Sequence, residues 1–177
     1  MLFDLERLTL ADRRALSRLN DSKQHTEEGR EELYPLVCRA AAKAVIVSRC
    51  PRGIDSRGLH VTNLNALADM LGRVAVPDAV CLSDGFRLGS RCRVEHEAVV
   101  EGDSRSAAIA AASVVAKVTR DRYMRQAAGR YPGWDFETNV GYSSPQHRDA
   151  IVRNGICSLH RRSFASTAYH QLELGSA

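Results

Sequence analysis

The stretch SRSAAIAAASVVAKVTRDRYMRQAA, residues 104–128, carries the strongest helix signal in the chain. Alanines and valines dominate it, and neither proline nor glycine occurs before Gly129. Because glycine and proline are the poorest helix formers and alanine the best, the stretch predicts one helix over 104–128. Its small side chains would allow close packing against a sheet. The helix follows Glu101-Gly102-Asp103 directly, so an acidic residue lies at its start.

Short apolar runs elsewhere in the chain predict strands. They are Ala44–Val47, Ala79–Ser83 and Val94–Val100, the last of which alternates more than the others. Runs of this length, bounded by turn-forming residues, are typical of buried strands. Strands that alternate with helices predict an α/β fold in which helices flank a sheet.

Capping residues predict where further helices begin. Thr9 precedes a helix ending near Leu19, and Thr26 precedes one with two acidic residues in its first turn. Another helix is expected from Thr62 to Gly72. Ser144-Pro145, a cap followed by proline at the first helical position, predicts a helix closed by Gly155, and the helical C-terminal segment is expected over about 144–177.

Composition limits the class of protein. The 177 residues are 44% hydrophobic and 26% charged, which is typical of a globular protein of one domain, 1–177, and excludes disorder along the whole length. The longest apolar stretch, Ala40–Val47, is interrupted by Lys43 and is far too short to span a bilayer. Five cysteines without a C-x-x-C motif predict reduced thiols and a cytoplasmic location. A net charge of +4 permits a polyanionic partner.

Two aspartates follow predicted strands. Asp84 comes just after one strand and Asp103 just after another. The carboxyl ends of strands are where α/β folds bind ligands, so these carboxylates could converge on a hard divalent cation. An alternative stays open for each residue: Asp84-Gly85 is also an ordinary turn signal, and Asp103 is also an ordinary helix N-cap.

Basic and aromatic residues offer contacts for a nucleic acid. Lys23 lies in a polar loop and Lys117 on the long helix, which continues into Arg120-Asp121-Arg122. Phosphate contacts use such residues, but a solvated helix face with local ion pairs is the better explanation of the cluster by itself. Tyr142 lies in a polar loop before a helix, where it could stack on a sugar or base or pack on the domain surface. Phe164 is expected in the core.

Together these segments resemble the ribonuclease HII family, the type 2 ribonucleases H. The matching residues, in family order, are Leu19-Asn20-Asp21-Ser22-Lys23, Leu82-Ser83-Asp84-Gly85, Glu101-Gly102-Asp103, residues 110–122, Arg130-Tyr131-Pro132-Gly133, Gly141-Tyr142-Ser143 and His160-Arg161-Arg162-Ser163-Phe164. The run from Ala112 to Asp121 is the most specific of them.

The resemblance implies a ribonuclease H-like fold and an endonuclease, a metal-binding hydrolase of DNA replication and repair. It implies cleavage of the RNA strand of RNA–DNA hybrids, or at ribonucleotides in duplex DNA, assisted by Mn²⁺ or Mg²⁺. Asp84 and Asp103 match two of four family acids and would be catalytic metal ligands. Tyr142 matches the tyrosine that packs on the sugar at the junction, and Lys23 matches a loop lysine that binds substrate. Lys117 lies in the matching helix run and is expected to contact substrate as well.

The chain departs from the family at its front. The family begins with two strands and an adjacent Asp-Glu pair, and no such pair occurs in these 177 residues. We therefore expect a fold without its first two strands and a natural gene product that begins further upstream. With two of the four acids missing, this chain alone is expected to cleave poorly. A complete protein is expected to be a monomer, whereas an open sheet edge favours self-association.

Two alternatives to an active nuclease remain. One is a non-catalytic module that binds RNA–DNA hybrids through Tyr142 and Lys23, and the other is an inactive fragment without a stable fold.

Overall fold

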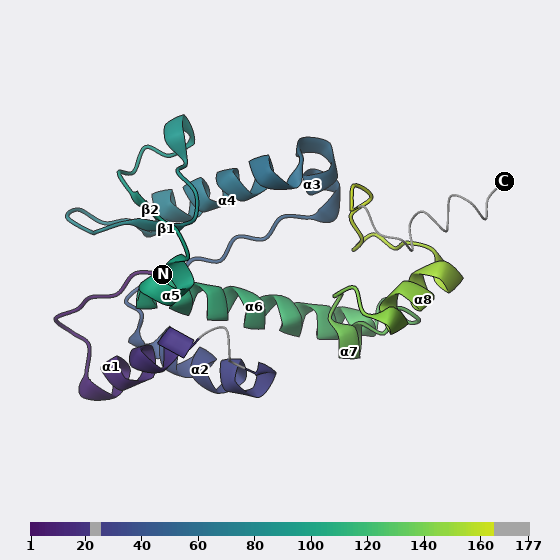
Figure 1. Cartoon of the computed structure of the whole chain (residues 1–177), viewed down its shortest axis with the longest axis horizontal. Coiled ribbons are helices and arrows are strands. Elements are labelled where there is room, and N and C mark those ends of the chain that lie inside the picture. The colour runs from purple at the N-terminus through teal and green to yellow at the C-terminus, as the bar shows by residue number, and fades with distance from the viewer. Residues whose placement is uncertain (22–25, 165–177) are drawn as a thin grey trace. The chain divides into compact units, whose positions relative to one another are not determined.

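The structure is a computed structural model that describes residues 1–21 and 26–164. It is a mixed α/β fold, mostly helical, with one small parallel sheet (Figure 1). In chain order the elements are α1 Leu10–Ser17, η1 Arg18–Asp21, α2 Glu27–Ala40, α3 Pro51–Arg57, α4 Leu59–Val74, β1 Leu82–Asp84, η2 Gly89–Arg91, β2 Glu97–Val99, α5 Gly102–Arg105, α6 Ala107–Ala128, α7 Phe136–Asn139 and α8 Pro145–Asn154. None of the described helices is long and apolar enough to cross a membrane.

Contacts divide the residues into two compact units. The first comprises Met1–Ser48 and Asn63–Val118, and the second comprises Arg49–Thr62 and Thr119–Ala177. The helices α4 and α6 each run from one unit into the other. The expectation of a single domain over 1–177 stays a prediction.

The core of the first unit joins the first half of α6 to α1, η1 and α2. Its buried residues are Leu16, Leu19, Leu33, Val37, Ala110, Ala111, Val114, Val115 and Val118. Burying each leucine or valine contributes about 1.5–3 kcal/mol. Ala110 and Ala111 are fully buried in this cluster. The described core cluster contains no residue of β1 or β2, so the partners of this face of α6 are helices rather than the expected sheet.

Side-chain caps begin α1 and α2 as predicted. The Thr9 hydroxyl accepts a hydrogen bond from the Asp12 N–H at 3.2 Å, and the Asp12 carboxylate accepts one from the Thr9 N–H at 3.0 Å. This reciprocal pair is a capping box. The Thr26 hydroxyl accepts from the Gly29 N–H at 3.2 Å. Each cap satisfies an N–H group that the helix itself leaves without a partner.

The single helix expected over 104–128 is two helices. Helix α5 covers Gly102–Arg105 and α6 begins at Ala107, because Ser106 adopts an extended conformation with φ −135° and ψ 118°. The Ser106 hydroxyl accepts from the Ile109 N–H at 3.4 Å, so this serine caps α6. Serine favours caps over helix interiors, and propensity summed over the stretch conceals such a break.

The sheet pairs β1 with β2 in parallel. Leu82 lies opposite Glu97, and Asp84 lies opposite Val99. Both strands were predicted, but they are shorter than the apolar runs suggested. Val80 is 86% exposed and lies outside the ladder, because strand residues are held by their partners rather than by their own propensity.

The strand predicted over Ala44–Val47 is wrong. Residues 44–50 are irregular, and Ile46 is 51% exposed. Backbone pairing stops just before them, at an isolated antiparallel bridge between Leu2 and Lys43. A β-branched run becomes a strand only beside another strand, and no described residue pairs with 44–47.

The core of the second unit is an aromatic cluster. Phe136 is 1% exposed and packs with Met124 and Val140. The partly buried side chains of Tyr131 and Trp134 pack against these three residues. The Trp134 ring stacks on Phe136 with a centroid distance of 6.4 Å and an interplanar angle of 14°. The Trp134 indole N–H donates to the Gly155 carbonyl at 2.9 Å, which ties this cluster to the end of α8.

Helix α8 begins and ends at the predicted residues. The Ser144 hydroxyl accepts from the His147 N–H at 3.1 Å, Pro145 is the first helical residue, and Gly155 ends the helix with φ +72°. Residues 155–164 are irregular, with turns at 158–159 and 162–163, and the rest of the segment expected over 144–177 lies outside the described residues.

Asp55 of α3 fixes residues 162–163. Its carboxylate accepts from the backbone N–H groups of Arg162 and Ser163, both at 2.9 Å, and from the Ser163 hydroxyl at 2.6 Å. The bond from that hydroxyl is the main cause that lowers the pKa of Asp55. Phe164, expected in the core, is instead 42% exposed beneath the Arg161 guanidinium, so that prediction is wrong. The aromatic side chains of residues 131–136 already fill this core.

Stability of the second unit is expected to fall between pH 6.5 and 4. Burial, and secondarily the charge of His147, lowers the pKa of His160 from 6.5 to about 4. The unfolded chain therefore takes up a proton that the folded chain resists, so stability decreases as pH falls through this window and is level above it. His160 is only half-buried, so we expect a loss of about 1–2 kcal/mol rather than the full value of the shift. Urea unfolding at several pH values measures it.

The matched control for this pH dependence is His160→Gln. In this variant the free energy of unfolding should no longer change between pH 6.5 and 4. Its decrease below pH 4, where carboxylates take up protons, should remain. An equal slope in the variant would show that another group carries the effect.

Candidate active site

Asp84 lies at the end of β1, where its carboxylate contacts the turn before α5. Asp84 Oδ1 accepts a hydrogen bond from the Gly102 N–H at 3.0 Å. The Phe86 N–H donates to the Asp84 carbonyl at 2.9 Å across Gly85, which has φ +69°, so the expected Asp-Gly turn is present too. Asp84 thus forms the turn and also reaches the residue next to Asp103.

Gly102 makes this contact possible. A Cβ atom at position 102 would lie 2.5 Å from Ile109 Cδ1 and 3.0 Å from Asp84 Oδ1, which is too close for both. Glu101, just before it, has φ +53°, a left-handed conformation that costs a residue with a side chain about 1–2 kcal/mol. This turn brings the Gly102 N–H to the carboxylate of Asp84. The role of Gly102 as a hydrogen-bond donor was not predicted, although a glycine before an acid at a helix start indicates a close backbone approach.

Asp103 is the second residue of α5 and is partly buried. The residue at the N-cap position of α5 is Glu101, which makes no side-chain cap bond, so the interpretation of Asp103 as an N-cap is wrong. The Asp103 carboxylate is therefore not used to cap the helix.

A cation held by Asp84 and Asp103 would have to take its other ligands from water and substrate. Mg²⁺ is usually held in this way, by one or two carboxylates and by phosphate oxygens. Asp84 keeps Oδ2 without a hydrogen bond to any described residue. Within residues 1–21 and 26–164, no group of three or more His, Cys, Asp or Glu side chains is placed to hold a metal ion. A metal site built on Asp84 and Asp103 would therefore draw on two carboxylates of the described chain rather than on a full protein cage.

Of the two lysines predicted to contact substrate, the structure describes one. Lys117 is exposed on α6, and it belongs to the first unit, as do Asp84 and Asp103. Lys23 lies outside the described residues.

Tyr142 lies in a firmly held loop of the second unit. The Tyr142 N–H donates to the Asn139 carbonyl at 2.8 Å, and the Asn139 side chain accepts from the Gly141 N–H at 2.7 Å. The Tyr142 ring is 55% exposed, so it is partly covered by the domain surface and partly open to solvent. Its exposed face is available for stacking.

Arg120 supports Tyr142 from α6. Its guanidinium carbon lies 4.7 Å from the centroid of the Tyr142 ring. The same guanidinium donates to the Val140 carbonyl at 2.7 Å and to the carboxylate of buried Asp121 at 3.0 Å. The alternative of a local ion pair is thus present in the structure, between Arg120 and Asp121. The arginine positions the tyrosine, a role that sequence spacing did not reveal because Arg120 and Tyr142 are far apart in the chain.

Comparisons with known proteins identify the family of this chain. The sequence model of the family "Ribonuclease HII" matches residues 11–167. Ribonuclease HII of Mycobacterium tuberculosis strain H37Rv is 41% identical over 150 residues, covering 85% of this chain and 56% of that protein. The enzyme named ribonuclease HII in Rhizobium johnstonii is 42% identical over 146 residues, covering 82% of this chain and 63% of that protein.

A solved structure shares the fold. The crystal structure of the ribonuclease H2 from Pyrococcus horikoshii OT3 matches with a TM-score of 0.77 at 19% identity, covering 98% of this chain and 87% of that chain. The fold is thus that of a type 2 ribonuclease H. The chain belongs to the ribonuclease HII family. It spans about 56–63% of the length of these curated relatives.

Proposed function

We propose that this chain carries part of the active site of an endonuclease that hydrolyses the RNA strand of RNA–DNA hybrids, and cuts at ribonucleotides within duplex DNA. The observation that carries the proposal is the hydrogen bond from the Gly102 N–H to Asp84, which joins the end of β1 to the residue before Asp103. In this proposal Asp84 and Asp103 hold Mg²⁺ or Mn²⁺.

The cation would polarise the phosphodiester and lower the pKa of bound water. The chain's own residues would position the cation and bind the substrate. Gly102 fixes one oxygen of Asp84 and leaves the other for the ion. Tyr142 offers an exposed ring to a sugar at the ribonucleotide–deoxyribonucleotide junction, with Arg120 behind it. Lys117 and Lys23 contribute positive charge toward phosphates, without providing sequence specificity.

A second candidate is a module that binds hybrids without cutting them. It is favoured by the small ligand set, since the described residues contain no group of three potential metal ligands. Hydrolysis by two metal ions requires that both ions are held beside the reacting phosphate. A chain with few metal ligands would bind the hybrid without cleaving it.

One assay separates the two candidates. The 177-residue chain is incubated with a labelled RNA–DNA hybrid in Mn²⁺ and in Mg²⁺, and both binding and cleavage are measured. Cleavage that leaves 3′-hydroxyl and 5′-phosphate ends supports the nuclease. Salt-sensitive binding with no cleavage supports the module. Absence of both, together with no cooperative unfolding, would support an inactive fragment and contradict both candidates.

Tyr142→Ala should reduce the preference for a ribonucleotide–deoxyribonucleotide junction over continuous hybrid. A stacked aromatic contributes about 1–3 kcal/mol, so we expect a loss of roughly 5- to 150-fold at the junction. Affinity for Mn²⁺ should not change, because Tyr142 touches neither carboxylate in this proposal. Competition binding with the two substrates measures the preference.

Tyr123→Ala is the matched control, since Tyr123 is a similarly exposed tyrosine on α6. Tyr142→Phe should keep the stacking and hence the preference. An equal loss in the Tyr123 variant would contradict a specific role for Tyr142.

A further inference from the structure

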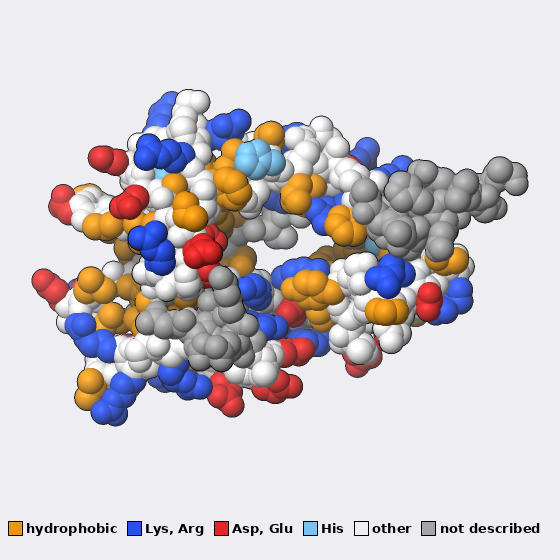
Figure 2. Space-filling model, in the orientation of Figure 1, with side chains coloured by type: hydrophobic (Ala, Val, Ile, Leu, Met, Phe, Trp, Pro, Cys, Tyr) orange, Lys and Arg blue, Asp and Glu red, His pale blue; other side chains and the backbone are white. Residues whose placement is uncertain are grey.

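The loop that joins β1 to β2, residues 85–96, is rich in arginine. It holds Arg87, Arg91 and Arg93 against one acidic residue, Glu95, which gives a net charge of +2 with histidine neutral. All three arginines are exposed. Figure 2 shows Lys and Arg side chains gathered at the upper left, where Figure 1 places this loop.

These arginines have no ion pair with any described residue, as is also true of Arg13, Arg14 and Arg105 in the same unit. Other arginines of the first unit do pair with acids: Arg7 with Asp4, Arg18 with Glu32, Arg39 with Asp12 and Arg73 with Asp69. The loop therefore presents positive charge that the protein itself does not neutralise.

The loop is held in one conformation from within. Leu88 is fully buried, and its N–H donates to His96 Nε2 at 3.2 Å. His96 Nδ1 lies 2.9 Å from the Val94 carbonyl, which only accepts, so Nδ1 carries the proton and Nε2 is the acceptor. The Ser83 hydroxyl donates to the Phe86 carbonyl at 2.6 Å. A braced loop loses little entropy when its side chains bind a ligand.

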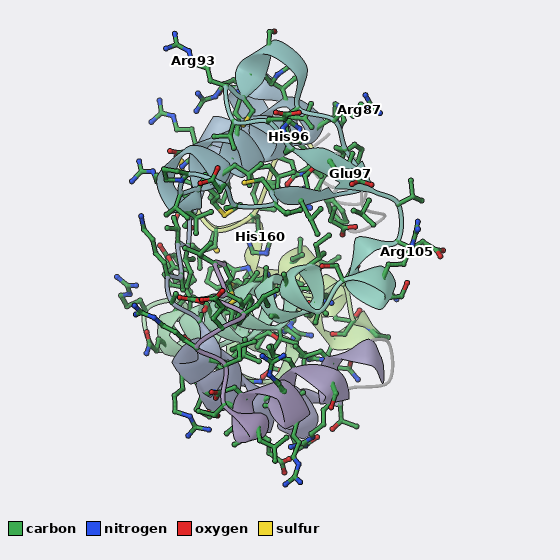
Figure 3. The ribbon with its side chains drawn as sticks, turned by 90° about the vertical axis from the view of Figure 1, so that its left-hand side faces the viewer. Arg87, Arg93, His96, Glu97, Arg105 and His160 are labelled. Carbon is green, nitrogen blue, oxygen red and sulfur yellow. The ribbon has the colours of Figure 1, made fainter. Side chains whose placement is uncertain are left out.

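The loop begins at the proposed metal site. Arg87 follows Asp84 by three residues, and Arg105 follows Asp103 by two. Figure 3 shows Arg87 and Arg105 projecting on the same side of the first unit, while Arg93 projects on the opposite side of the loop. A long polyanion that reaches the carboxylates from the first side would pass Arg87 and Arg105, whereas Arg93 faces a second strand on the other side of the loop.

We propose that residues 85–96 form a phosphate-binding arm that contacts the two sugar–phosphate backbones of a nucleic-acid duplex, through Arg87 on one side of the loop and Arg93 on the other, together with Arg91. The inference rests on the proposed function and adds a binding surface to it. Guanidinium groups bind phosphate oxygens in pairs, and such contacts fix a duplex in place without reading its sequence. The arm therefore binds RNA–DNA hybrid and duplex DNA alike.

The test is the salt dependence of binding. Fluorescence anisotropy measures the affinity of the 177-residue chain for a labelled RNA–DNA hybrid between about 50 and 200 mM salt. The triple variant Arg87→Gln, Arg91→Gln, Arg93→Gln should show a shallower log–log slope, by about 0.9 for each phosphate that the arm no longer binds. At 0.1 M salt that corresponds to roughly five- to tenfold weaker binding for each such phosphate.

A control variant with the same change in charge is Arg14→Gln, Arg52→Gln, Arg153→Gln, which replaces exposed arginines outside the loop. It should keep the slope of the parent chain. If the loop variant keeps that slope and affinity while the parent binds hybrid, the arm is wrong and the proposed function stands. If the parent binds no hybrid, the proposed function fails and this inference fails with it.

Discussion

Replacing Asp84 with asparagine is expected to reduce hybrid cleavage at least about 100-fold. Loss of a residue that merely supports a metal ligand costs up to about that factor, and a ligand itself should cost no less. Asparagine keeps an oxygen that can accept from the Gly102 N–H, so the contact between β1 and the turn before α5 is retained. The change therefore removes the charge and leaves the local fold. Initial rates in Mn²⁺ and Mg²⁺ measure the effect.

Asp78→Asn is the matched control for charge. Asp78 is exposed in the same unit and has φ +63°, a conformation that asparagine tolerates well. Its cleavage rate should equal that of the parent chain. Unchanged cleavage in the Asp84 variant, or an equal loss in both variants, would contradict the assignment of Asp84 as a metal ligand.

Phe136→Ala is expected to reduce the free energy of unfolding of the second unit by about 3–5 kcal/mol. The side chain is 1% exposed and touches rings on several sides, including Trp134 and His147. Its removal leaves a cavity that rigid rings fill poorly. Because Phe136 begins α7, which ends at Asn139, the loop that holds Tyr142 should also loosen. The fluorescence of Trp134, the single tryptophan, reports unfolding of this unit.

Phe86→Ala supplies the comparison for this measurement. Phe86 is 42% exposed in the first unit, so its removal should cost no more than about 0.5 kcal/mol. Equal effects of the two substitutions would show that the aromatic cluster does not stabilise the second unit.

Local signals in the sequence predicted the helix starts well. Thr9, Thr26 and Ser144 each cap a helix because a hydroxyl one residue before a helix satisfies a backbone N–H within the same turn. Gly155 ends α8 for an equally local reason, its positive φ. Such features need only a few adjacent residues, so a single sequence contains them.

Predictions that depend on distant partners were less accurate. The run Ala44–Val47 has the composition of a strand, but its backbone has no neighbouring strand among the described residues. The alanine-rich stretch 104–128 was expected to pack on a sheet, and the buried residues of α6 instead meet α1, η1 and α2. Composition indicates that a face is buried, but not which element covers it.

The candidate site was predicted in part. Spacing after the strands singled out Asp84 and Asp103, and the structure adds the bond from Asp84 to the neighbour of Asp103. That bond joins residues that are far apart in sequence, as does the contact of Arg120 with Tyr142. Neither pair has a local sequence signal, because each contact forms only when distant segments of the chain fold together.

A titration of Mn²⁺ binding tests most directly whether Asp84 and Asp103 hold one ion. Electron paramagnetic resonance measures free Mn²⁺ with the parent chain, Asp84→Asn, Asp103→Asn and the double variant. If both carboxylates bind the same ion, each single variant loses most of the affinity and the double variant loses little more. Parent-like affinity in either single variant, or two losses that add fully in the double variant, would contradict a shared site.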